Sequence, residues 1–286
     1  MADVSTDRGL PHIDPAAAQI TGVLSRPRAI AAVCIVVLAA TGWLYLGLLA
    51  GFVPGSDTAN YLAALCRPVL TGQDFSAGAA ALVALMWVAM TLAMMLPSAG
   101  PMILTYAEIA DTAARKGERI VSPLVLAGGY LAVWFGFALA AAALQVGIMR
   151  IAGFESAMTQ AYAPIAAVLF IGAGLYQFSA LKQACLSVCQ RPFPFFFMNW
   201  TDRASGVFRL GVRQGLHCVG CCWAMMLLMF AAGTMNVVWM ALLGLVMVIE
   251  KLSKTTRFSR IVGAGFIVAG TMIAAAWIGG LELNVW

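Results

Sequence analysis

Residues 77–106 of this 286-residue chain read AGAAALVALMWVAMTLAMMLPSAGPMILTY and contain no charged side chain. About 20 apolar residues in a helix cross a hydrocarbon core about 30 Å thick, so this run is long enough to cross it with a tilt. A helix satisfies its own backbone hydrogen bonds, which lipid cannot do. The run therefore predicts a transmembrane helix, and with it an all-α membrane fold.

Similar apolar runs recur along the rest of the chain. Hydrophobic residues make up 62% of it and charged residues 10%, whereas a soluble domain carries about 25% charged residues. We predict a polytopic transmembrane helical bundle of about seven spans, at Ala29–Gly51, Ala77–Tyr106, Val121–Met149, Ala163–Leu181, Leu216–Ala232, Val237–Ile249 and Ile261–Gly279. The fifth and sixth runs are short and form either a hairpin of two spans or a re-entrant pair.

The basic residues predict the orientation of this bundle. With the N-terminus in the cytoplasm, every Lys and Arg except Arg67 and Arg150 falls on the cytoplasmic side. Basic residues collect on that side of membrane proteins, so we expect a multi-pass protein of the cell inner membrane with its C-terminus outside. The net charge of +5 then reflects topology. No basic stripe with interleaved aromatics is present, so a nucleic-acid partner is not indicated.

The sequence predicts one membrane domain, residues 29–286, after a polar cytoplasmic tail at residues 1–28 that we expect to be disordered. The longest cytoplasmic connection, residues 182–215, contains RPFPFFFMNW at 191–200. In membranes, aromatic side chains favour the depth of the lipid headgroups, and basic side chains favour the membrane surface. This stretch therefore predicts an interfacial segment in contact with membrane lipid. The alternative is that this segment docks a partner protein.

The stretch HCVGCCWAMMLLM, residues 217–229, carries the clearest candidate chemistry. On a helix Cys218, Cys221 and Cys222 share one face, and Met225 continues the same stripe together with two further methionines. Thiolates and thioethers are soft ligands that favour Cu(I), and thiolates also bind zinc. The alternative is that these cysteines and methionines only fill an apolar interior.

A second pair, Cys185 and Cys189, follows the fourth span at the same spacing of four residues. In the predicted topology this pair and the cysteine triplet meet at the cytoplasmic boundary, where the reducing environment disfavours a disulfide. A structural zinc site of four cysteines is the alternative to copper. Cys34 and Cys66 stand alone, and we interpret them as packing residues.

Three further elements are candidates for the same site. Met90 and Met94 share a face of the second span, where Pro97 predicts a kink and a freed carbonyl. Glu250 is a carboxylate at the end of the sixth span, which either serves a site or reaches the headgroups. His217 offers an imidazole beside the triplet.

The composition and motifs also exclude several functions. The chain has two histidines, so haem held by two histidines and copper held by three are excluded within one chain. A phosphate-binding glycine loop, a nucleophile elbow and a zinc-protease HExxH are all missing from the sequence.

Three segments resemble a family of bacterial predicted metal-binding integral membrane proteins, some of them labelled copper chaperones. They are residues 87–101 (WVAMTLAMMLPSAGP), 176–189 (YQFSALKQACLSVC) and 215–251, which includes HCVGCCWAMM, GTMNVVWM and the pair Glu250–Lys251. The resemblance implies that copper is bound. Relatives are encoded beside a small soluble protein, and some such pairs resemble copper-dependent membrane oxygenases that act on aromatic compounds.

Three functions follow from these observations. The first is the membrane component of a copper-dependent monooxygenase that oxidises a lipophilic small molecule, and its weakness is the scarcity of histidine. The second is a copper chaperone or transporter. The third is a scaffold with a structural zinc site that serves a soluble partner. The metal found in the purified protein distinguishes zinc from copper, and oxygen-dependent product formation distinguishes the two copper functions.

The orientation can be tested by thiol labelling of a variant that keeps only Cys185 and Cys189. We expect a membrane-impermeant maleimide to label this variant in inverted vesicles and to leave it unlabelled in intact spheroplasts, because both thiols are predicted on the cytoplasmic side. Labelling in spheroplasts but not in inverted vesicles would contradict the predicted orientation.

Overall fold

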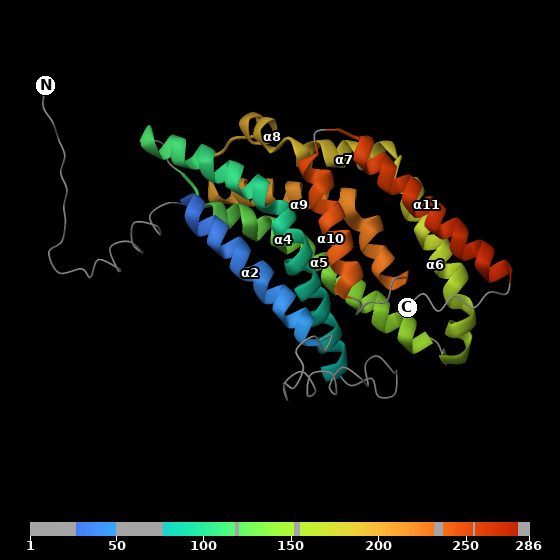
Figure 1. Ribbon diagram of the computed structural model, residues 1–286. Helices are drawn as coiled ribbons and strands as arrows, with labels where there is room; N and C mark the ends of the chain where they lie inside the picture. Colours follow the sequence, from blue (N-terminus) through green and yellow to red (C-terminus); the bar gives the residue numbers. More distant parts are fainter. Residues whose placement is uncertain are drawn as a thin grey trace, which may run out of the picture.

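The computed structural model describes residues 27–49, 77–117, 120–151, 155–231, 237–253 and 255–279, and it is helical throughout these ranges apart from short connections (Figure 1). The helices are α2 (Pro27–Leu49), α4 (Ala77–Arg115), α5 (Pro123–Ile151), α6 (Glu155–Gln177), α7 (Ala180–Gln190), α8 (Pro192–Met198), α9 (Ala204–Ala231), α10 (Val237–Leu252) and α11 (Arg257–Ile278). The predicted all-α class is confirmed for the described residues. The predicted tail at residues 1–28 lies almost wholly outside them.

Within the described residues, four helices are long and apolar enough to cross a membrane, namely α4, α5, α9 and α11. The count rises to five if α6 and α7 form one span, although the two helices are bent by 64° at their junction. The helices at the other two predicted spans fall short of spanning length: α10 has 16 residues, and the apolar part described for α2 is Ala32–Leu44. Apolar helices of membrane-spanning length are therefore present, and the count of seven is not confirmed.

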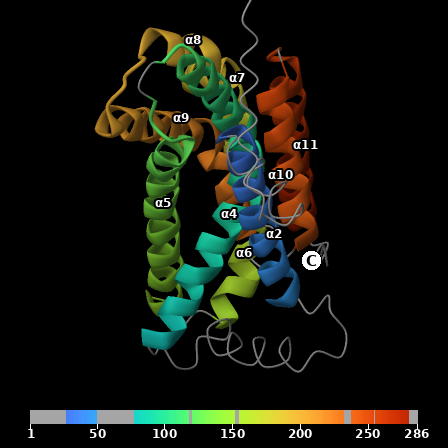
Figure 2. The same ribbon diagram turned by 90° about the vertical axis from the view of Figure 1, so that its left-hand side faces the viewer.

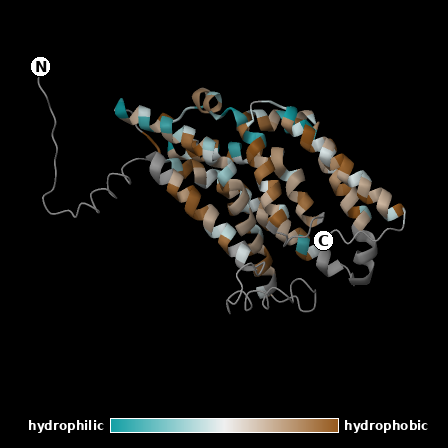
Figure 3. Ribbon diagram, viewed as in Figure 1, coloured by the Kyte–Doolittle hydropathy of each residue, from teal (hydrophilic) through white to brown (hydrophobic). Residues whose placement is uncertain are grey.

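The polar residues gather at one end of the bundle, where α4 ends and where α7 and α8 lie (Figure 3). The predicted interfacial connection at 182–215 is itself helical, since it consists of most of α7, all of α8 and the first turns of α9. α7 and α8 lie at this end of the bundle in both views (Figure 1 and Figure 2). α9 begins at Ala204, well before Leu216, where the fifth span was predicted to start. The last part of the predicted connection is therefore the first part of α9.

Two prolines inside α4, Pro97 and Pro101, interrupt its backbone hydrogen bonds. Pro97 cannot donate to the carbonyl of Ala93, and Trp43 of α2 donates its indole N–H to that oxygen instead, at 2.9 Å. α4 changes direction along its length (Figure 1), as a helix with internal prolines does. The released carbonyl therefore joins α2 to α4 in a place where lipid could supply no donor.

Glycines bring two helix pairs into backbone contact. A Cβ at Gly129 of α5 would overlap the carbonyl oxygen of Phe208 in α9, and one at Gly211 of α9 would overlap the carbonyl oxygen of Leu126 in α5. In the pair α6 and α11, a Cβ at Gly263 would lie 2.7 Å from Cβ of Gln177. Small residues allow such close approach between membrane helices, where van der Waals packing replaces the hydrophobic effect.

This packing predicts a position-dependent cost for enlarging a glycine of α11. Gly263→Ala should lower the unfolding free energy in detergent by about 1–3 kcal/mol, because the added methyl group overlaps α6. The matched control is Gly265→Ala, two residues away in the same helix, where a Cβ meets nothing within 4 Å. Thermal unfolding that is equally affected by both substitutions would contradict the close packing of α6 and α11.

Candidate metal centre

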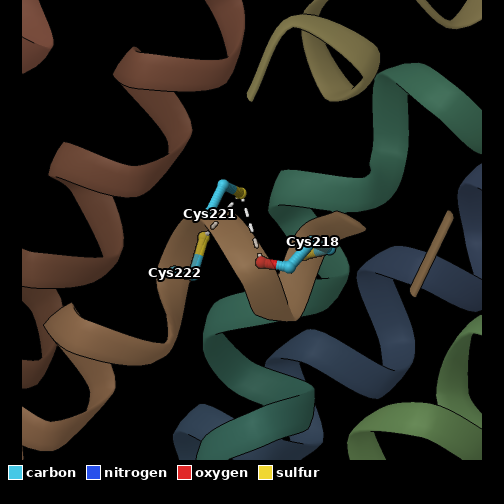
Figure 4. A group of neighbouring side chains, drawn as sticks. All are labelled: Cys218, Cys221 and Cys222. Atoms are coloured by element: carbon cyan, nitrogen blue, oxygen red, sulfur yellow. Dashed lines mark hydrogen bonds between the residues drawn. The ribbon is translucent and has the colours of Figure 1, made fainter. Parts of the chain in front are cut away.

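Cys218, Cys221 and Cys222 lie on one face of α9, and their three Sγ atoms are all within 4.8 Å of one another (Figure 4). The thiol of Cys221 donates to the carbonyl oxygen of Cys218 at 3.1 Å and lies 3.3 Å from the sulfur of Cys222. All three residues are buried. Metal–sulfur bonds of about 2.3 Å hold three equatorial sulfurs about 4 Å apart, so only small side-chain rotations separate this cluster from a three-sulfur site.

Cys218 has two polar partners from other helices. The hydroxyl of Tyr130 in α5 lies 3.0 Å from its Sγ atom, and Nζ of Lys251 in α10 donates to the same sulfur at 3.0 Å. Lys251 also donates to Oγ of Ser98 in α4 at 2.7 Å. The Tyr130 hydroxyl of α5 and the Lys251 ammonium of α10 thus meet at one sulfur of α9, and Ser98 of α4 holds Lys251 from the other side. The ammonium donor stabilises that sulfur in the thiolate form that binds metals.

None of these three partners of the cluster was predicted from the sequence. Lys251 follows Glu250 at the end of an apolar run, a position typical of a lysine that reaches the headgroups. Tyr130 and Ser98 look like ordinary members of apolar helices. Their common signal is that each is a polar group inside an apolar run, where every such group needs a partner.

Glu250 lies outside the group of cysteine sulfurs and forms an ion pair instead. Its Oε2 atom accepts a hydrogen bond from Nζ of Lys182 at 2.8 Å, and both side chains are 1% exposed. Gln190 of α7 donates to the backbone carbonyl of Glu250 at 2.8 Å. Oε1 of Glu250 has no hydrogen-bond partner in the described part of the chain. The structure therefore places this carboxylate between α7 and α10, beside the cluster.

The second cysteine pair lies on α7, which packs against α9. The thiol of Cys189 lies close to that of Cys221. The Sγ atom of Cys185 lies 2.7 Å from the place that a Cβ on Gly220 would occupy, so the glycine inside the motif admits this sulfur. Neither cysteine belongs to the tight group of three. The predicted gathering of five cysteines is thus a tight triplet with two half-buried thiols beside it.

The methionines of the predicted site are buried in the same core as the cysteines. Met90, Met94 and Met225 are each at most 1% exposed, and the Met94 side chain faces Gly244 of α10. Met95, which was not among the predicted ligands, lies with its sulfur 4.0 Å from Oγ of Ser98. That serine connects it to Lys251 and so to Cys218.

His217 is turned away from the cysteine sulfurs. Its Nδ1 atom lies 2.7 Å from the carbonyl oxygen of Arg213, and its ring packs edge-on to Phe195 of α8, with ring centroids 6.3 Å apart. It is not part of the cysteine group. The donors at the centre are therefore sulfur atoms, and soft thiolate donors select Cu(I) or zinc.

Residues 84–273 match the model of the PpoB2 family, which is described as copper chaperone. The chain belongs to this family. The resemblance stated from the sequence is thereby confirmed. Copper, the metal named in the family description, suits the three-cysteine site. No curated protein and no solved structure matches the chain.

The buried ion pair beside the centre predicts an asymmetric response to substitution. Lys182→Met should lower the unfolding free energy by about 3–5 kcal/mol, because it leaves the Glu250 carboxylate buried and unpaired. The double variant Lys182→Met with Glu250→Met should recover most of that loss, since no charge then remains unpaired.

Thermal unfolding in detergent measures both effects. The control is Arg115→Ala, which removes an exposed pair with Asp111 at 4.0 Å and should cost less than about 1 kcal/mol. A double variant that is no more stable than Lys182→Met would show that the unpaired charge of Glu250 does not cause the loss of stability.

Proposed function

We propose that this PpoB2 protein binds Cu(I) as cargo at Cys218, Cys221 and Cys222 and passes it on by exchange between thiolates. The observation that carries the proposal is the group of three buried sulfurs within 4.8 Å of one another, placed inside a bundle of apolar helices. Cu(I) is a soft ion that thiolates bind in preference to harder donors. Each thiol that becomes a ligand releases its proton to the solvent as the copper–sulfur bond forms.

The half-buried thiols of α7 support transfer rather than permanent storage. Cys189 lies next to Cys221, and Cys185 lies next to Gly220, so sulfur donors continue from the triplet toward the polar end of the bundle. An ion held by two or three thiolates moves to a neighbouring thiolate without passing through a free state. Cys189 is therefore the proposed first acceptor or donor for copper on the side of α7.

The proposal includes the finer points of the predicted topology. The protein lies in the cell inner membrane with its N-terminus in the cytoplasm, and α2 and α10 complete a bundle of about seven spans. The polar end of the bundle, with α7 and α8, then faces the cytoplasm. Membrane lipid is the expected surrounding of the exposed apolar side chains on α5, α6 and α11.

A small soluble protein is the proposed partner at the cytoplasmic end. A cavity of about 770 Å³ lies between α4 and α8, and its lining includes Asp111, Phe193, Phe197 and Trp200. Phe193 and Phe197 stack on each other with centroids 6.2 Å apart, and both are exposed. Exposed aromatic side chains beside charged ones are typical of protein interfaces.

The monooxygenase function receives no support from the site. Copper that activates oxygen generally rests on imidazole, and His217, the histidine within the described residues, faces away from the sulfurs. A site made of thiolates suits Cu(I) that is held and transferred without a change of oxidation state.

Metal binding by the purified full-length protein tests the proposal. In mild detergent we expect one Cu(I) to bind with high affinity in competition with a chromophoric Cu(I) chelator. Each of Cys218→Ser, Cys221→Ser and Cys222→Ser should weaken binding by at least about tenfold, because a hydroxyl is a poor ligand for a soft ion. The triple variant should lose the site.

The matched control is Cys34→Ser, which removes a half-buried thiol on α2 that lies outside the cluster and should leave the affinity unchanged. Stoichiometric zinc without Cu(I) binding would favour the structural site. Tight Cu(I) binding by the triple variant would show that the cargo site lies elsewhere.

A further inference from the structure

Lys251 is a buried cation without a carboxylate partner in the described part of the chain. Lys251 is 8% exposed. Its Nζ atom donates to Sγ of Cys218 at 3.0 Å and to Oγ of Ser98 at 2.7 Å. The carboxylate next to it in sequence, Glu250, pairs with Lys182 instead. The positive charge of Lys251 is thus directed at the cysteine cluster.

A buried ammonium requires a counter-charge, because its desolvation is costly. Ser98 and Tyr130 offer only neutral hydroxyls at this position. Among the described residues that accept a hydrogen bond from Lys251, Cys218 is the one that can supply a negative charge, as its thiolate. Any metal ion bound at the cluster therefore experiences the positive charge of Lys251.

We infer that Lys251 is a specificity-determining residue that makes the cysteine cluster favour monovalent over divalent soft ions. The inference rests on the proposed function and deepens it, since it concerns the charge of the ion that the same site accepts. With the same three thiolates, a complex of a monovalent ion carries one more negative charge than a complex of a divalent ion. A neighbouring ammonium stabilises the more negative complex relative to the other.

The size of this effect follows from Coulomb's law. A unit charge about 5 Å from the metal, in an effective dielectric of about 20, changes the relative affinity for the two ions by on the order of a hundredfold. A purely structural role for Lys251 would lower the affinity for both ions together and leave their ratio unchanged. The ratio, rather than either affinity alone, is therefore the diagnostic quantity.

The test measures this ratio in the detergent-purified full-length protein. Cu(I) is compared with Zn(II), and Ag(I) with Cd(II), because Ag(I) and Cd(II) are both soft and neither changes oxidation state during the titration. Proton release is counted in weakly buffered solution, which shows whether both ions of a pair take the same number of thiolates. Lys251→Met keeps the length of the side chain and removes its charge. We expect it to shift both ratios toward the divalent ion by about ten- to a hundredfold.

Two further variants complete the design. Lys251→Arg keeps the charge and should hold the ratios within about threefold of the parent protein. Lys116→Gln removes one positive charge from an exposed position at the end of α4 and should leave the ratios unchanged. If Lys251→Met does not yield folded protein, Lys251→Gln supplies the neutral variant, and a large shift in Lys251→Arg would still contradict the inference.

The outcomes separate this inference from the proposed function. If the parent protein fails to bind Cu(I) and Ag(I) at all, the proposed function fails and the inference fails with it. If the parent binds them but the neutral variants keep its ratios, or shift them toward the monovalent ion, only the role of Lys251 is overturned.

Discussion

Two opposite charges at consecutive positions, Glu250 and Lys251, are buried at the C-terminal end of α10, and much of the centre depends on how each is compensated. Glu250 is directed toward α7, where it meets Lys182 at 2.8 Å. Lys251 is directed toward α9 and α4, where it meets Cys218 and Ser98. A charge in a medium of low dielectric is tolerated only when it is paired and hydrogen-bonded. These two pairings therefore hold α4, α7, α9 and α10 in register around the sulfurs.

The remaining helices support this arrangement by packing. Glycines bring α5 against α9, which places the Tyr130 hydroxyl beside the sulfur of Cys218. The prolines of α4 release a carbonyl that α2 satisfies through Trp43. The carbonyl of Met95 accepts from Ser98 at 2.8 Å. A neighbouring helix thus satisfies the irregular backbone of α4 at Ala93, and a bond within α4 keeps Ser98 in place for Lys251.

Much of the fold and the inner part of the site could be predicted from the sequence, because both follow local rules. Apolar runs predict helices, and the spacing of Cys218, Cys221 and Cys222 places them on one face of a helix without further information. The partners of Glu250 and Lys251 could not be predicted, since they come from helices far away in sequence and their choice depends on how those helices pack. The position of His217 could not be predicted for a related reason: it immediately precedes Cys218 on α9, and one residue of helical rotation brings its ring against Phe195 of α8.

The ion pair between Lys182 and Glu250 joins residues that are 68 positions apart in the chain. During synthesis at the ribosome, α7 emerges long before α10, so Lys182 has no counter-ion while α9 is being inserted. A lone ammonium is far more stable in water than in lipid. α7 is bent by 64° from α6, and Ser179 caps its start. α7 can therefore remain in contact with water until α10 has been synthesised. The thiols of Cys185 and Cys189 lie on the same segment, and the surroundings of the cysteine cluster are completed only when α10 packs against α7 and α9.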